Sequence, residues 1–360
     1  MSTTKAAPVR HKPDNVDQRL LNALQAGIPM VRRPFAPIAE TVGIGEDEVL
    51  ARMQVLKDAA IIRQVSAIFD TRALSYESTL VAASYPDDRL FDAAAIINGH
   101  PGVSHNYRRT HHFNMWFTLA LEPESRLSLE ETLGILARET GATSMRILPT
   151  LTLYKINVQL DMTGQTDSAA RAEPVAPPKR GDGKPVSDDD RQAILILQQD
   201  MPLVSEPFDV WATAAGMDVD TLLAKAQELQ DRTVMRRFAA VLNHRKAGFG
   251  ANGMAVWKVP VDDVDDFGAR MATFRSVSHC YKRPTYDDWP YNLFTMVHAT
   301  SKDACEETIA ALATEAGLSA SDYAVLYSTF EFKKVRLKYY SPEYRAWEDL
   351  AIAGSTLPTA

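Results

Sequence analysis

The apolar positions near the start of the chain recur with the period of an α-helix. Leu20, Leu24 and Ile28 fall on one helical face. Two further short helices are predicted at residues 38–42 and 46–58, with a glycine-containing turn between them. Three short helices of this kind are typical of a helix-turn-helix domain. The same pattern returns later in the chain, at residues 191–199, 209–215 and 218–231.

After each set of helices, the pattern changes to strands that alternate with helices. In the first half we expect strands at residues 78–85, 103–109, 114–121 and 144–156, and helices at residues 90–98 and 129–139. In the second half we expect strands at residues 253–260, 277–283, 291–299 and 323–337, and helices at residues 264–274 and 304–316. The order βαββαβ is typical of a ferredoxin-like fold, whose antiparallel sheet carries helices on one face. The two bare sheet faces are expected to cover each other and to leave a cleft between them.

The sequence therefore predicts an α+β protein with an internal duplication. Each half is expected to be a winged helix-turn-helix followed by a ferredoxin-like βαββαβ domain. The segment between the halves is rich in Pro, Ala, Gly, Asp and Lys, which is typical of a flexible linker. The first dozen and the last ten residues are predicted to be loose. The predicted domains are 14–65 (helix-turn-helix 1), 66–160 (ferredoxin-like 1), 161–187 (linker), 188–238 (helix-turn-helix 2), 239–340 (ferredoxin-like 2) and 341–360 (tail).

The two halves share a motif that is rich in His, Tyr and Arg. Residues 103–118 read VSHNYRRTHHFNMWFT, and residues 277–295 read VSHCYKRPTYDDWPYNLFT. Side chains alternate along a strand, so every second residue of each motif is expected on one face. Imidazole, phenol and guanidinium groups on one face suit a cleft for a large, flat, acidic ligand. The residues predicted to share a face are Val103, His105, Tyr107 and Arg109 in one copy and Val277, His279, Tyr281 and Arg283 in the other.

Composition and charge narrow the class of protein. The chain has 360 residues and a net charge of −7, which argues against a general affinity for nucleic acid. An anionic ligand would therefore need a local basic pocket. The sequence contains no apolar run long enough to cross a bilayer and no secretory leader, so we expect no membrane partner. Its two cysteines, Cys280 and Cys305, do not make a disulfide framework and favour a cytoplasmic location.

Fold and motif together resemble a known family. A helix-turn-helix joined to a ferredoxin-like ligand domain resembles the Lrp/AsnC regulators. More specifically, HNYRRTHHFNMWFT is similar to the D/G-type subunit of the sirohaem decarboxylases. SHCYKRPTYDDWPYNLFTMVHA and the segment NHRKAGF at residues 243–249 resemble the L/H-type subunit. The resemblance covers about residues 14–160 and 188–340, so the chain looks like a natural fusion of the two subunits.

This resemblance implies an activity and a substrate. Members of the family remove the carboxyl groups of two acetate side chains of sirohaem and give didecarboxysirohaem. That product feeds haem d1 biosynthesis or the alternative haem route, and the fused form favours haem d1. No organic cofactor is implied, because the protonated macrocycle is its own electron sink. Iron enters as part of the sirohaem substrate.

The resemblance also implies roles for individual residues. His105 and His279 are candidates for proton donor or ligand of the substrate iron, and His111 is a further candidate iron ligand. Tyr107 and Tyr281 are expected to hydrogen-bond a carboxylate or to orient a histidine. The residues expected to bind substrate carboxylates are Arg108, Arg109, Lys282, Arg283 and Arg245. For Arg245, a surface salt bridge is an equally good interpretation.

Two other functions remain open from the sequence. One is an Lrp/AsnC-type transcription regulator or tetrapyrrole-binding sensor, and the other is a haem carrier without chemistry. The candidate recognition helices begin with Glu46, Asp47 and Glu48 and with Asp218 and Asp220. Acidic side chains there would repel phosphates, so no DNA partner is expected. Exposed sheet and helix faces are compatible with a homodimer. The sequence leaves open which of the two clefts is active.

Overall fold

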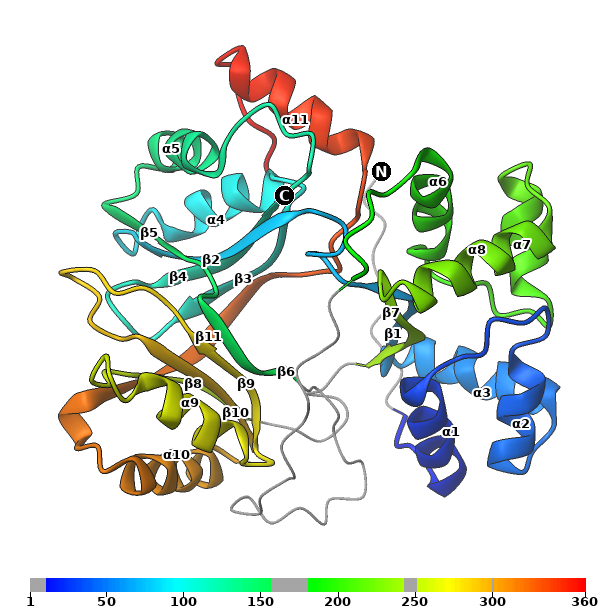
Figure 1. Ribbon diagram of the computed structural model, residues 1–360, viewed down its shortest axis with the longest axis horizontal. Coiled ribbons are helices and arrows are strands. Elements are labelled where there is room, and N and C mark those ends of the chain that lie inside the picture. The colour runs from blue at the N-terminus through cyan, green and yellow to red at the C-terminus, as the bar shows by residue number, and fades with distance from the viewer. Residues whose placement is uncertain (1–10, 157–180, 243–250, 300) are drawn as a thin grey trace. The chain divides into compact units, whose positions relative to one another are not determined.

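The computed structural model describes residues 11–156, 181–242, 251–299 and 301–360. The chain divides into two compact units. Unit 1 comprises Met1–Leu74 and Lys179–Gly248, and unit 2 comprises Ser75–Pro178 and Phe249–Ala360. Each half of the repeat therefore contributes to both units, as the colours of Figure 1 show. Most of the predicted linker, residues 161–187, lies outside the described residues.

Unit 1 contains two copies of a three-helix domain, as predicted. The first helix of each copy begins at a capping box, in which Asp14 pairs with Asp17 and Ser187 pairs with Asp190. This shared start signal supports the duplication at the level of local structure. The helices are α1 (Asn15–Ala26), α2 (Phe35–Val42), α3 (Glu46–Asp58), α6 (Asp188–Leu197), α7 (Pro207–Ala214) and α8 (Val219–Asp231).

A two-stranded antiparallel ribbon, which the sequence pattern did not predict, joins the two copies. β1 (Ile62–Phe69) pairs with β7 (Met235–Leu242). Both strands have three consecutive buried residues in the middle. They therefore lack the alternation by which a strand is recognised in a sequence. The domain boundaries predicted after residues 65 and 238 fall inside these strands.

Unit 2 contains one antiparallel sheet of nine strands, in the order β5-β2-β4-β3-β11-β8-β10-β9-β6. The predicted order βαββαβ is confirmed in both halves. In Figure 1, α4 and α5 lie beside the strands of the first half, and α9 and α10 lie beside those of the second. The strands are β2 (Glu77–Ser84), β3 (Val103–Arg109), β4 (Met115–Leu121), β5 (Ser144–Leu148), β6 (Thr152–Ile156), β8 (Ala251–Trp257), β9 (Val277–Lys282), β10 (Leu293–Ala299) and β11 (Tyr323–Lys334). The helices are α4 (Leu90–Gly99), α5 (Leu129–Thr140), α9 (Val264–Ala272) and α10 (Lys302–Ala316), with a short 3-10 helix at Ala320–Asp322.

The last strand of each half pairs with a strand of the other half. β11 pairs first with β8 and then with β3, where Ser328 lies opposite Arg109 and Lys334 opposite His105. The corresponding strand of the first half, predicted as one strand at residues 144–156, is two strands. β5 pairs with β2, and β6 crosses to β9. The interruption contains Pro149, which has no backbone N–H to donate to a ladder.

Apolar side chains fill both faces of the sheet. Two clusters lie under the helices, one in each half. A third cluster combines residues of the two halves, so the halves pack against each other through the sheet face opposite α4, α5, α9 and α10. We call this face the inner face. The predicted contact between the sheet faces of the two halves is present, but the halves form one continuous sheet, and the cleft expected between them stays a prediction. Its buried members are Ala82, Phe113, Trp116, Leu148, Met254, Val256, Trp289, Phe294 and Leu326.

Residues 341–360, predicted as a tail, are largely packed, so this prediction is wrong. They form helix α11 (Pro342–Ile352) and a following segment that contacts the first half. Tyr344, Trp347 and Leu357 are buried in the cluster under α4 and α5. The Ala360 N–H donates to the Ala95 carbonyl oxygen at 3.0 Å. The helical spacing of the apolar residues of α11 carried this signal, but the polar composition of the segment concealed it.

No helix within the described residues combines the length and the apolar character that crossing a membrane requires.

Candidate functional site

The two histidine motifs lie on β3 and β9, and each strand has an irregular register just before its histidine. The pairing of β3 shifts between Val103 and His105, and the pairing of β9 shifts between Val277 and His279. Both valines are buried in the clusters under the helices. The extra residue turns the side chains that follow it to the inner face. The prediction that the valines share a face with the histidines is therefore wrong.

In the first copy, His105, Tyr107 and Arg109 lie in sequence on the inner face. The ring centres of His105 and Tyr107 are 6.2 Å apart. The guanidinium carbon of Arg109 lies 5.6 Å from the centre of the Tyr107 ring. Arg109 Nη1 donates a hydrogen bond to the Leu326 carbonyl oxygen of β11 at 2.8 Å. β11, a strand of the second half, therefore fixes the position of the Arg109 side chain at the end of the first motif.

The second copy repeats this geometry. The ring centres of His279 and Tyr281 are 5.9 Å apart, and the guanidinium carbon of Arg283 lies 4.9 Å from the Tyr281 ring centre. Arg283 also lies over Phe294 at 5.4 Å and donates to the Leu148 carbonyl oxygen. The structure thus brings together the predicted imidazole, phenol and guanidinium in each copy. We call each set of three residues a strip.

The guanidinium of Arg109 is buried in an environment that suits an anion. Its exposed fraction is 7%, and burial lowers its pKa to about 10, so it remains charged at neutral pH. Within the described part of the chain, Arg109 makes no ion pair, and its Nε has no acceptor. A buried charge without a counterion is costly for the free protein. A carboxylate from a ligand would remove that cost.

Two of the predicted carboxylate-binding residues point away from the strips. Arg108 Nη2 binds Asp87 at 3.0 Å, and Lys282 Nζ binds Asp265 at 3.1 Å. Both acidic partners lie at or near the start of a helix, at α4 and α9. The alternation of side chains along β3 and β9 explains this placement. Arg108 and Lys282 are therefore engaged with protein carboxylates and are not part of the inner-face lining.

Comparisons with known proteins identify relatives of this chain. The family model "AsnC-like ligand binding domain" matches residues 73–155 and 246–333, and "Siroheme decarboxylase NirDL-like HTH domain" matches residues 17–63 and 190–236. The siroheme decarboxylase of Hydrogenobacter thermophilus is 39% identical over 92% of this chain and 97% of its own. The siroheme decarboxylase beta subunit of Methanosarcina barkeri is 38% identical over 41% of this chain and 97% of its own length. These matches decide the family.

The chain belongs to the sirohaem decarboxylase family. It has the fused arrangement, because each family model matches it twice and the separate beta subunit matches less than half of it. Solved structures of the siroheme decarboxylase NirDL share this fold, with a TM-score of 0.73, 34% identity and coverage of 94% of this chain and 99% of the other. One of them is a complex with an iron-uroporphyrin III analogue.

His111, a candidate iron ligand in this family member, lies in the turn between β3 and β4. Its Nδ1 accepts a hydrogen bond from the Phe113 N–H at 3.1 Å, so the ring hydrogen is on Nε2. Burial, with a smaller contribution from His112, lowers the pKa of His111 to about 4. His111 is therefore a neutral donor in this structure, which is not the state that binds iron through Nε2. Arg245 lies outside the described residues.

Sequence reasoning missed three residues that contact the strips or the turn beside them. Trp289 is fully buried, and its ring centre lies 5.2 Å from that of His111. Its position in the variable part of the second motif gave no signal. Ser104 and Ser278 contact the motif histidines through their side chains. Their repetition in both copies of Val-Ser-His was a signal that the prediction did not use.

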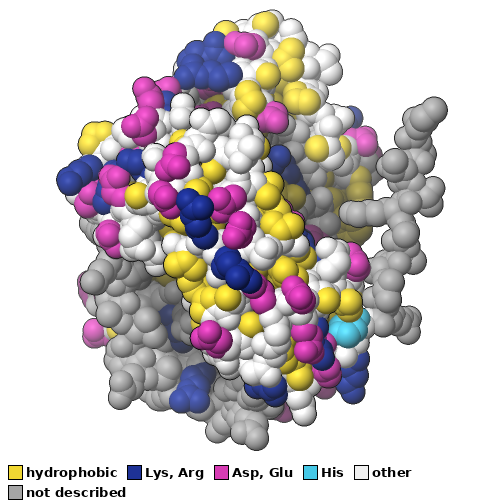
Figure 2. Space-filling model, turned by 90° about the vertical axis from the view of Figure 1, so that its right-hand side faces the viewer, with side chains coloured by type: hydrophobic (Ala, Val, Ile, Leu, Met, Phe, Trp, Pro, Cys, Tyr) yellow, Lys and Arg dark blue, Asp and Glu magenta, His cyan; other side chains and the backbone are white. Residues whose placement is uncertain are grey.

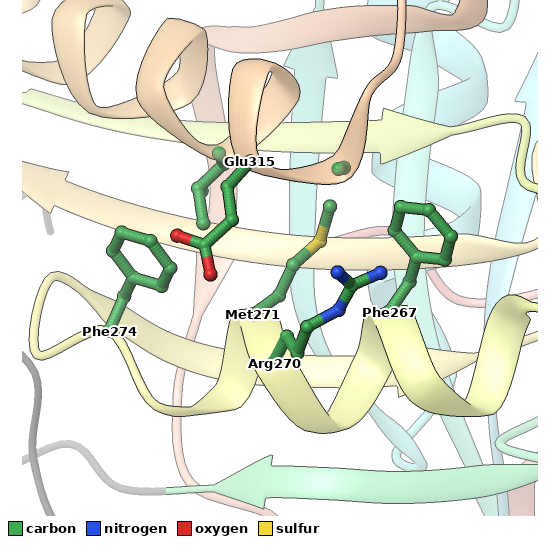
Figure 3. Close-up of a pocket in the computed structure, with 7 residues that line it drawn as sticks. Phe267, Arg270, Met271, Phe274 and Glu315 are labelled. Carbon is green, nitrogen blue, oxygen red and sulfur yellow. The ribbon is translucent and has the colours of Figure 1, made fainter.

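A small pocket on the other side of the sheet is not the site. It lies between α9 and α10 and is lined by Phe267, Arg270, Met271, Phe274 and Glu315, among others (Figure 3). Its empty volume of about 170 Å³ is below the range of about 300–1,000 Å³ that is usual for small-molecule sites. It also contains no residue of either strip. A tetrapyrrole would not fit there.

Two arginines of the helical unit are paired with acidic side chains. Figure 2 shows Lys and Arg side chains interspersed with Asp and Glu on the face in view. Arg32 binds Asp209 and Asp220 at 3.5 and 3.2 Å, and Arg33 binds Glu46 at the start of α3. Arg32 is thus paired with acids of the second three-helix copy, and Arg33 with an acid of its own copy.

Proposed function

We propose that this chain is a sirohaem decarboxylase, a carboxy-lyase that removes the carboxyl groups of two acetate side chains and releases didecarboxysirohaem. The observation that carries this proposal is the duplicated strip of imidazole, phenol and guanidinium on the inner face. A relative that covers nearly the whole chain is named siroheme decarboxylase. A solved relative binds an iron-uroporphyrin III analogue, which supports an iron tetrapyrrole as the substrate.

The reaction needs a proton and no oxidant. Protonation of the ring carbon that bears the acetate turns the pyrrole into an electron sink. The bond between the side-chain methylene and the carboxylate then breaks, and its electron pair moves into the ring as carbon dioxide leaves. Transfer of the proton from the ring to the exocyclic carbon gives a methyl group. Each turnover of one acetate therefore consumes one proton and releases one carbon dioxide, with no organic cofactor.

The buried guanidiniums supply the charge that binding requires. Sirohaem carries eight carboxylates, and Arg109 and Arg283 are buried cations on the inner face with exposed fractions of 7% and 8%. Arginine binds a carboxylate through two parallel hydrogen bonds, which fixes orientation as well as charge. We assign these two residues to non-reacting carboxylates. Tyr107 and Tyr281 lie between the arginine and the histidine and would bind or orient the carboxylate beside the reacting group.

We further propose that the chain acts in the cytoplasm. Both cysteines are free and buried, which fits a reducing cytoplasm. The product would feed haem d1 biosynthesis or the alternative haem route, and the fused chain favours haem d1. The acidic pairing in the helical unit argues against the alternative of a transcription regulator.

The direct test is an anaerobic incubation of the purified full chain with sirohaem, followed by mass spectrometry. We expect a product that has lost two molecules of carbon dioxide, formed without an added cofactor. Tight binding of unchanged sirohaem would support a carrier or sensor. A shift of promoter DNA at physiological salt would support a regulator.

A further inference from the structure

Each motif histidine contacts the serine that precedes it. Ser104 Oγ lies 3.0 Å from His105 Nδ1, and Ser278 Oγ lies 2.8 Å from His279 Nδ1. A hydroxyl can donate one hydrogen bond and can also accept, so either nitrogen of a neutral imidazole can carry the ring hydrogen. The other partner of each hydroxyl therefore decides the tautomer.

In the second copy, the other partner is a carbonyl group. Ser278 Oγ lies 3.3 Å from the Met296 carbonyl oxygen. A carbonyl can only accept, so the Ser278 hydroxyl hydrogen goes to Met296. Ser278 Oγ then accepts the hydrogen of His279 Nδ1. In this arrangement Nε2 is the unprotonated ring nitrogen of His279.

In the first copy, the other partner is a hydroxyl. Thr118 Oγ1 lies 2.9 Å from Ser104 Oγ and also accepts the His105 backbone N–H at 3.2 Å. Because Thr118 Oγ1 already accepts this N–H, we assign its hydroxyl hydrogen to Ser104 Oγ, the acceptor that the described residues offer it. The Ser104 hydroxyl then donates to His105 Nδ1. His105 therefore carries its ring hydrogen on Nε2.

The difference between the tautomers of His105 and His279 has one origin in the sequence. Thr118 lies opposite His105 in β4, and Met296 lies opposite His279 in β10. The two positions are equivalent in the repeat, but one has a hydroxyl and the other does not. The exchange of threonine for methionine breaks the symmetry of two otherwise matching strips.

We infer that Ser278 positions His279 as the ligand of the sirohaem iron through Nε2, whereas the chain of Thr118 and Ser104 holds His105 with a hydrogen on Nε2, facing the substrate. This inference rests on the proposed function and assigns different roles to the two histidines. A metal bond requires the nitrogen lone pair, which His279 presents and His105 does not. Ser104, Thr118 and Ser278 are positioning residues, since they act through the histidines.

The tautomers can be measured in the full chain without any ligand. Protein with ¹⁵N-labelled histidine is examined by long-range ¹H–¹⁵N NMR at about pH 8.5, about two units above the ordinary histidine pKa of about 6.5. His105→Gln and His279→Gln variants assign the signals. We expect the unprotonated nitrogen to be Nε2 in His279 and Nδ1 in His105. The same tautomer in both rings would overturn the inference.

Two pairs of variants test the positioning residues. Ser278→Ala is expected to switch His279 to the Nε2–H form that free imidazole side chains prefer, whereas Ser278→Thr keeps the wild-type form. Thr118→Val is expected to give a mixture of tautomers at His105, and Thr118→Ser keeps one form. An unchanged His279 signal in Ser278→Ala would contradict the role of Ser278. The Thr118 pair gives an independent answer if Ser278→Ala does not fold.

Iron ligation is tested with iron-uroporphyrin III as the probe. We expect His279→Ala to shift the Soret band of the complex and added imidazole to restore it, whereas His105→Ala leaves the band in place. Restoration in His105→Ala instead would overturn the assignment of the ligand. Failure of the wild-type chain to bind the probe would overturn the proposed function together with the ligand, while the tautomers measured without ligand would stand.

Discussion

Replacement of His105 by alanine is expected to lower the rate of carbon dioxide release about 100-fold or more. A positioned general acid contributes roughly 10²–10⁴-fold to a reaction, and the tautomer inferred above places a hydrogen on His105 Nε2. The side chain is half-buried on β3, so its loss is expected to change stability little. Single-turnover measurements with sirohaem give the rate, and urea unfolding gives the stability.

A conservative variant separates proton transfer from hydrogen bonding. His105→Gln keeps a donor but cannot gain and lose a proton near neutral pH. We expect it to be as slow as His105→Ala while it binds iron-uroporphyrin III within about threefold of the wild-type affinity. His298→Ala, a half-buried histidine of β10 outside the strips, is the matched control and is expected to retain activity. Recovery of the rate in His105→Gln would show that His105 is not the acid.

Replacement of Arg109 by methionine is expected to weaken binding of iron-uroporphyrin III by about 2 kcal/mol or more, which is about 30-fold. The variant removes a buried cation that is satisfied only in part by the Leu326 carbonyl oxygen. Loss of this hydrogen bond lowers the free energy of unfolding of the free protein, whereas loss of the unpaired buried charge raises it. We therefore expect the free energy of unfolding to change by less than about 2 kcal/mol.

The neighbouring residue provides the control for this prediction. Arg108→Met removes a cation of the same size from the same strand, but Arg108 is half-exposed and pairs with Asp87. We expect its effect on binding to be below about threefold, because exposed ion pairs contribute little. Titration calorimetry with both variants at one salt concentration makes the comparison. Equal losses in the two variants would indicate a general electrostatic effect and not a site at Arg109.

The sequence predicted most of the elements because their signals are local. The helical spacing of Leu20, Leu24 and Ile28 and the alternation in the later strands are properties of neighbouring residues. The repeat then predicted the packing of two open sheet faces. The paired strands β1 and β7 were missed, since their buried centres do not alternate. Helix α11 was missed because its buried contacts lie in the other half of the repeat.

Prediction of the site was limited by the direction of side chains. The grouping of His105, Tyr107 and Arg109 followed from alternation alone, and the structure agrees. The same rule places Arg108 on the opposite face, although the resemblance had suggested a substrate contact. The irregularity that separates Val103 from His105 has no signature in composition or spacing. Long-range pairing with β4 and β11 determines it, and pairing of this kind is not visible in one sequence.

A crystal structure of the full chain with iron-uroporphyrin III would show whether the inner face of unit 2 holds the tetrapyrrole. We expect ligand carboxylates within hydrogen-bond distance of Arg109 or Arg283 and the iron bound to His279 Nε2. A macrocycle bound against the helices α9 and α10 or on the helical unit, with both strips unoccupied, would contradict it.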